Sequence, residues 1–138
     1  MNTADLTELI LPRLDASTAT LSARLRSDGL EAKRELGHYT SRRLALCAYA
    51  SFDDGAEEGT IDLMLEVTER GDGGSIALGI YRESGRIIIE APPIEVPGEF
   101  TAAVSAEVMD EFDTLIDQAY ALIVSEIRGT SAGHSDAQ

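Results

Sequence analysis

Carboxylates recur at helical spacing near the end of the chain and are its most evident chemical groups. Five side chains make up this acidic ridge: Glu107, Asp110, Glu111, Asp113 and Asp117. Steps of three and four residues place the aspartates on one face of a helix. A metal site would need a second acidic helix opposite the first, and residues 1–28 offer none, so we expect no bound metal. Two interpretations remain: a binding site for a basic partner, and a plain solvated helix face.

A second candidate site combines one histidine with aromatic and thioether side chains. His38 is expected in the link between the first helix and the first strand, and its ordinary pKa of about 6.5 would suit a general base. Tyr49, Met64 and Tyr81 alternate onto one face of the predicted strands. Together these four residues could line a pocket for a small ligand.

Other nucleophiles and metal ligands lack the spacing that catalysis needs. Cys47 lies in a predicted strand, away from the helix N-termini that activate thiols. No Gly-x-Ser-x-Gly turn or His-Glu-x-x-His pair occurs. The acidic and glycine-rich segments 53–59 and 71–74 are predicted to be turns between strands, since neither has the alternation of a calcium loop. We expect no cofactor, and these patterns favour a protein without enzymatic activity.

Charge is distributed very unevenly along the chain. Residues 1–52 contain 7 basic and 6 acidic residues, whereas residues 53–138 contain 4 and 19, which together give the net charge of −14. Such a surface repels nucleic acid and anionic lipid and attracts basic proteins. The chain start has no basic and apolar leader pattern, no apolar run is long enough to span a membrane, and there is one cysteine. These features predict a cytoplasmic protein.

The hydrophobic period changes twice along the chain. Apolar residues recur at helical steps over residues 6–25, with Gly29 as the expected stop. Strict alternation then predicts strands over 42–52, 61–67, 76–80 and 87–89, separated by short turns. Residues 31–38 are expected to form a helical turn or a loop, and the prolines at 92, 93 and 97 are expected to end the sheet. A last helix is predicted from the N-cap Ser105 to Arg128, with Gly129 after it.

These elements predict an α+β domain with two layers. Both terminal helices would pack on one face of a four-stranded antiparallel meander. Residues 1–128 would form a single domain, and residues 129–138 a disordered tail. The other sheet face would stay open and is unusually apolar around Cys47, Met64, Ala77 and Ile88, which predicts a homodimer.

The function that best fits this sequence is a non-enzymatic acidic protein that caps or escorts a basic protein partner, as immunity proteins and secretion chaperones do. At the level of topology, a helix, a meander and a helix in a small acidic protein is similar to the type III secretion chaperones, and this likeness implies escort of a partner. The alternative is a small-molecule-binding module or small enzyme with a pocket on the open sheet face.

Overall fold

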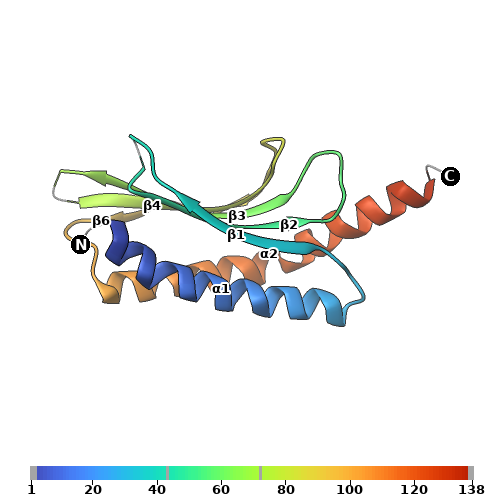
Figure 1. Ribbon diagram of the computed structural model, residues 1–138, viewed down its shortest axis with the longest axis horizontal. Helices are drawn as coiled ribbons and strands as arrows, with labels where there is room; N and C mark the ends of the chain where they lie inside the picture. Colours follow the sequence, from blue (N-terminus) through green and yellow to red (C-terminus); the bar gives the residue numbers. More distant parts are fainter. Residues whose placement is uncertain (1–2, 43, 72, 137–138) are drawn as a thin grey trace.

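The computed structural model describes residues 3–136, apart from residues 43 and 72 (Figure 1). Eight helices and strands follow one another: α1 (Thr3–Ser27), β1 (Lys33–Tyr39), β2 (Leu46–Asp53), β3 (Ile61–Arg70), β4 (Gly73–Arg82), β5 (Ile87–Glu90), β6 (Ile94–Val96) and α2 (Ala102–Asp136). Thus the fold is α+β, as expected, but the sheet has six strands and not four.

The sheet is an antiparallel meander in the order β1-β2-β3-β4-β5, and β6 also pairs with β4. Figure 1 shows α1 and α2 side by side on the same face of the sheet. No other described element covers the opposite face, so the two-layer arrangement predicted from the sequence is confirmed. We call that opposite face the open face.

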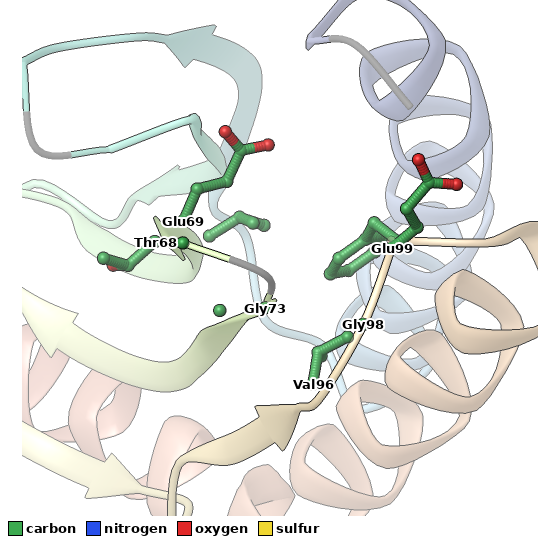
Figure 2. Close-up of a pocket in the computed structure, with 10 residues that line it drawn as sticks. Thr68, Glu69, Gly73, Val96, Gly98 and Glu99 are labelled. Atoms are coloured by element: carbon green, nitrogen blue, oxygen red, sulfur yellow. The ribbon is translucent and has the colours of Figure 1, made fainter.

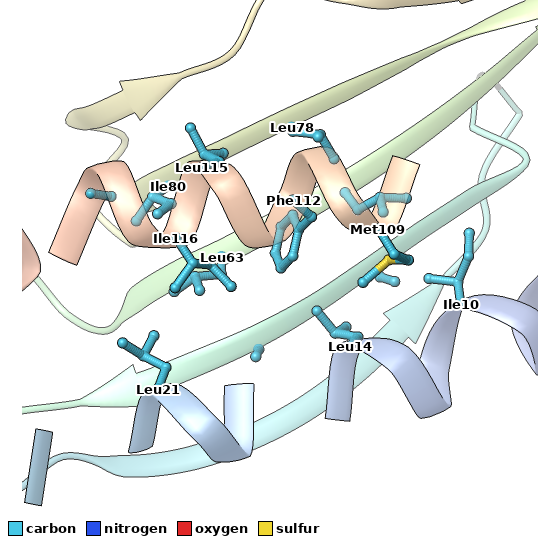
Figure 3. Packing of buried hydrophobic residues seen from close by; sticks show 14 of the residues in the cluster. Ile10, Leu14, Leu21, Leu63, Leu78, Ile80, Met109, Phe112, Leu115 and Ile116 are labelled. Carbon is cyan, nitrogen blue, oxygen red and sulfur yellow. The ribbon is translucent and has the colours of Figure 1, made fainter. Parts of the chain in front are cut away.

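The core lies between the sheet and the helices, and strand alternation builds its sheet side. Ile61, Leu63 and Leu65 of β3 are fully buried, and each pairs in register with a β4 residue. The intervening β3 residues point to the open face. From the helices, Phe112 and Leu14 enter the same cluster, as Figure 3 shows. Burying one such side chain stabilises the fold by about 1.5 to 3 kcal/mol.

β1 corrects the expectation that residues 31–38 form a helical turn or a loop. Lys33–Tyr39 is the edge strand of the sheet and pairs with all but the first residue of β2. Arg34 occupies a helix-facing position there, where strands of a two-layer fold commonly have an apolar residue. Its guanidinium reaches the Asp15 carboxylate at 2.8 Å and the Thr18 hydroxyl at 2.9 Å. The sequence pattern missed this strand because none of its residues is fully buried and a paired arginine takes one of its helix-facing positions.

The prolines at 92 and 93 do not end the sheet, contrary to expectation. They separate β5 from β6, and both short strands pair with β4 along the same edge. Proline cannot donate to a ladder, but it is tolerated where an edge strand is interrupted. The second sheet edge is therefore a strand broken into two pieces.

α1 ends as the sequence predicted. The amide of Gly29 donates to the Arg26 carbonyl, that of Leu30 donates to the Leu25 carbonyl, and Gly29 has a φ of 75°. This is the Schellman arrangement, in which glycine adopts the left-handed conformation at no steric cost. Pro12 lies inside α1, which continues on both sides of it.

Both ends of α2 differ from the prediction. Thr101, and not Ser105, caps its start: the Thr101 hydroxyl accepts a 3.2 Å hydrogen bond from the Val104 amide. Ser105 is buried inside the first turns. The helix also passes Gly129, the expected stop, and continues to Asp136. The division into a domain of residues 1–128 and a disordered tail stays a prediction, and residues 137–138 lie outside the described part.

Candidate functional site

The acidic ridge of α2 lies along the seam between the two helices. The Arg13 guanidinium of α1 is 3.1 Å from the Asp110 carboxylate and 3.6 Å from that of Asp113. Ser17 donates a 2.5 Å hydrogen bond to Asp113. Arg24 lies 3.5 Å from Asp117. The three aspartates, which the sequence assigned to a partner, therefore already have partners on α1.

Tyr120 of α2 contacts the C-terminal end of α1. The Arg24 guanidinium lies over the Tyr120 ring, 3.6 Å from its centroid. The Tyr120 hydroxyl donates to the Arg24 carbonyl at 3.2 Å and to the Asp28 carboxylate. Burial and the hydrogen bond to Asp28 raise the pKa of Tyr120. The remaining two ridge residues, Glu107 and Glu111, are exposed.

A buried ion-pair network, which the sequence analysis missed, fixes the other end of α2. The Arg82 side chain is 1 % exposed, and its two terminal nitrogens donate to the fully buried Asp54 carboxylate at 2.9 and 2.8 Å. Glu126 of α2 accepts from Arg82 at 3.2 Å. Thr130 of α2 donates to Asp54 at 3.0 Å. Arg82 thus joins a loop, a strand and a helix.

The network continues to the protein surface through a second arginine. Arg86 donates to Glu58 at 2.6 Å and to Glu126 at 2.8 Å. These bonds lower the pKa values of both glutamates. Burial opposes ionisation of Asp54, but hydrogen bonds from Arg82 and Thr130 outweigh it, so its pKa also lies below the ordinary range. All three carboxylates are therefore charged at neutral pH.

One sequence signal points to this network. Arg82 continues the buried phase of β4 that contains Ile76, Leu78 and Ile80. An arginine at such a position must be paired, because an isolated buried charge is very costly. The identity of its partners could not be inferred, since Asp54 and Glu126 are far away in the chain.

The open face collects three of the four predicted pocket residues. Tyr49 pairs in register with Met64, which pairs with Gly79. Tyr81 folds back over Gly79, where any Cβ would collide with its hydroxyl. Tyr49 covers Gly37 of β1 in the same manner. The two glycines therefore make room for tyrosine rings that lie flat along the sheet.

His38, the fourth pocket residue, is on the other face of the sheet. It pairs in register with the core residue Ala48. With Leu11, Pro12 and Leu36 it borders a groove between α1 and the edge strand, of about 470 Å³. The pocket assembled from the sequence is therefore divided between two surfaces.

Charged side chains on the open face are mostly acidic. The register of the strands assigns two basic residues to this face, Arg70 and Lys33. It assigns six carboxylates to the same face: Glu35, Asp53, Asp62, Glu66, Glu90 and Glu95. Asp62 accepts hydrogen bonds from Ser51 at 2.7 Å and Thr60 at 2.6 Å. Glu66, at the centre, has no ion-pair or hydrogen-bond partner within the described residues.

Two tyrosines respond to this negative face. A hydrogen bond to Cys47, burial and, to a smaller extent, the nearby Glu66 charge raise the pKa of Tyr39 to about 12. Burial, Glu90 and Glu66 raise the pKa of Tyr81 to about 12. Burial also raises the pKa of the Cys47 thiol, so this fully buried cysteine stays protonated and is not an activated nucleophile.

A further cavity of about 440 Å³ lies between the β3–β4 hairpin and the segment that leads into α2 (Figure 2). Figure 2 shows Glu69 and Glu99 on opposite sides of it. Gly73 is required at its wall, because a Cβ there would meet the Val96 carbonyl oxygen. The cavity presents carboxylates and backbone groups, and no sequence pattern indicated it.

Comparison of the chain with protein-family models, with curated proteins and with solved structures finds no match in any of the three. Among the described residues, no cluster of three or more histidine, cysteine or acidic side chains is arranged to hold a metal ion. No helix in the described part has both the length and the apolar character needed to cross a membrane.

Proposed function

We propose that this protein is a non-enzymatic acidic binding protein that caps or escorts a basic protein partner. The observation that carries the proposal is that many of its basic side chains are paired within the protein. Within the described residues, six arginines form ion pairs with carboxylates of the same chain: Arg13, Arg24, Arg34, Arg70, Arg82 and Arg86. With these arginines already paired, the charges that remain available to a partner are mainly carboxylates.

Electrostatic steering explains what this surplus would achieve. A net charge of −14 on one small domain attracts a cationic protein over about 8 to 10 Å at physiological salt. Association then accelerates, and salt slows it. A cap for a basic protein needs these properties and requires no catalytic group.

The alternative, a small-molecule pocket on the open face, has weaker support. Tyr49, Met64 and Tyr81 do share that face, which favours it. His38, the residue of that set that would act as a general base, lies on the opposite face. Binding of a basic partner is therefore the function that the geometry supports best.

Affinity capture from the source cells tests the proposal. The purified protein is immobilised, and bound proteins are eluted with a salt gradient and identified. We expect a basic protein that binds at one-to-one stoichiometry when repurified, with an association rate that falls steeply from about 50 to 500 mM salt. A partner of neutral or acidic charge, or an association rate independent of salt, would refute the proposal.

A further inference from the structure

We infer that the basic partner docks on the open face of the sheet, with a cationic side chain, arginine above all, seated at Glu66 between Tyr39 and Tyr81. This inference rests on the proposed function and identifies the surface that performs it. The sequence had assigned that role to the acidic ridge of α2.

The two acidic surfaces differ in whether their charges are already used. On the ridge, Asp110, Asp113 and Asp117 lie within 3.6 Å of an α1 guanidinium. On the open face, Glu66 has no such partner within the described residues. A partner that bound the three ridge aspartates would compete with Arg13 or Arg24, whereas one that bound Glu66 would compete with no side chain of the described residues.

Glu66 is half-buried, and its nearest neighbours in the sheet are small. In register beside it are Cys47 on β2 and Ala77 on β4, both small, and Ala77 is exposed. Next along the face is Gly79, which has no side chain. Cys47 and Gly79 are themselves buried, Gly79 beneath the Tyr81 ring, so a partner would reach the half-buried Glu66 from the side of the exposed Ala77.

Aromatic side chains lie on both sides of the Glu66 position. Tyr39 pairs in register with Cys47 and is 46 % exposed, and its ring lies 6.4 Å from that of Tyr49. On the other side Tyr81 lies over Gly79, and, besides burial, the Glu90 charge is close enough to raise its pKa. A guanidinium fits such a site because its plane stacks on tyrosine while its N–H groups donate to a carboxylate.

The raised pKa values of two tyrosines give independent support. Tyr39 and Tyr81 come from different strands, and the Glu66 charge raises both pKa values. Glu66 thus projects its negative potential over the space between the two hydroxyls. A bound cation would lower that potential.

The same charges argue for the choice of a basic partner over a second copy of this chain. In a face-to-face pair, Glu35, Asp62, Glu66 and Glu90 of each copy would oppose a surface of like sign. Like charges brought together at an interface cost affinity. A cationic protein meets the face without that cost.

Binding of defined peptides tests the inference. One probe is a short synthetic peptide that alternates arginine with valine, and its control carries citrulline in place of arginine. Both are titrated by calorimetry against the wild-type protein and two variants. Glu66→Gln removes the central charge, and Glu107→Gln removes one exposed charge from the helical layer, so that the net charge of the variants is equal.

We expect the arginine peptide to bind and the citrulline peptide to bind far more weakly. Glu66→Gln should weaken binding about tenfold, as loss of a charge-assisted contact does, and Glu107→Gln by less than about twofold. Absorbance titration of the tyrosines provides a second readout. In Glu66→Gln, Tyr39 and Tyr81 should titrate below the wild-type value of about 12 but above the ordinary tyrosine value of 10, because the hydrogen bond to Cys47 and burial still raise their pKa values. A pKa of 10 for both tyrosines would show that the variant is unfolded around this site.

Ala77→Arg is a second variant that does not depend on removing Glu66. It adds an exposed cation opposite Glu66 and should weaken binding of the arginine peptide at least as much as Glu66→Gln does.

If the arginine peptide binds but all three variants bind it equally, the docking surface is elsewhere and only this inference fails. If neither peptide binds at any salt concentration, the proposed function fails as well. A dimer of the wild-type protein that Ala77→Arg dissociates would assign the face to a second copy and overturn the inference.

Discussion

At the scale of single residues, Arg82 is the side chain on which the most contacts depend. It donates to Asp54 through both terminal nitrogens, to the Gly59 carbonyl at 3.0 Å, and to Glu126. Its side chain and that of Asp54 are essentially excluded from water. Removing one member of such a pair leaves the other as a buried, uncompensated charge.

Arg82→Met should therefore lower the free energy of unfolding by about 3 to 5 kcal/mol, because Asp54 loses its counter-charge. Arg70→Met is the matched control, since Arg70 is 64 % exposed and lies 3.7 Å from Glu95. Its loss should cost less than about 1 kcal/mol. Denaturant unfolding of both variants measures the difference, and equal costs would show that the network contributes no more than a surface pair.

Acid should weaken the same network. The pKa values of Asp54, Glu58 and Glu126 are lowered in the folded protein. Carboxylates with a lowered pKa stabilise the fold above their unfolded pKa of about 4, and this contribution disappears as the pH falls through the folded value. Stability should accordingly decline below about pH 5. Glu126→Gln should flatten that decline in a series of urea titrations, and an unchanged slope would contradict this account.

At the scale of elements, alternation in β3 determines which side chains form the core. Leu65 is fully buried and lies between Ala48 and Leu78 in the register of the sheet. Leu65→Ala should cost about 2 to 5 kcal/mol in denaturant unfolding. Thr68→Ala, on the open face of the same strand, should cost less than about 0.5 kcal/mol. A small effect at Leu65 would mean that the strand register is wrong.

The ion pairs between α1 and the acidic ridge of α2 are predicted to contribute little to stability. Replacing Asp110, Asp113 and Asp117 together by Asn removes the partners of Arg13 and Arg24. These pairs are exposed, so the loss should be about 1 kcal/mol in total, reduced by relief of repulsion along α2. The double variant Glu107→Gln, Glu111→Gln serves as control. Thermal unfolding that leaves the triple variant equal to or above wild type would show that the seam pairs contribute nothing.

The elements that could be predicted from the sequence are those whose buried positions are apolar. β3 and the C-terminal cap of α1 follow directly from alternating side chains and from Gly29. β1 could not be predicted, because Arg34 fills a helix-facing position and only the fold supplies its partners Asp15 and Thr18. β6 is three residues long and follows two prolines, so no periodicity exists to detect.

The end of α2 escaped prediction for a related reason. Glycine normally favours termination, and Gly129 stands where the apolar pattern stops. In the structure Thr130 donates to Asp54 and to the Glu126 carbonyl, which holds the chain in the helix beyond the glycine. A contact with a loop 76 residues earlier outweighs a local preference that costs about 1 kcal/mol.

At the scale of the whole molecule, two layers leave one large surface with no element over it in the described part. The sequence predicted that this face mediates a homodimer, and that prediction has yet to be tested. The carboxylates on the face lead us to expect a monomer at micromolar concentration and low salt. Sedimentation velocity decides between the two states. Since salt screens repulsion, a dimer that appears only at high salt would identify the carboxylates as the barrier.

The Arg82 network also has a consequence for motion. It connects the β2–β3 loop, the end of β4 and the last turns of α2, segments that lie 28 and 44 residues from Arg82 along the chain. None of the three can move outward without breaking bonds to the other two. The far end of the molecule should consequently open as one cooperative unit, so that amides of the loop and of the end of α2 exchange with solvent at the same rate, and not by independent fraying of a helix end.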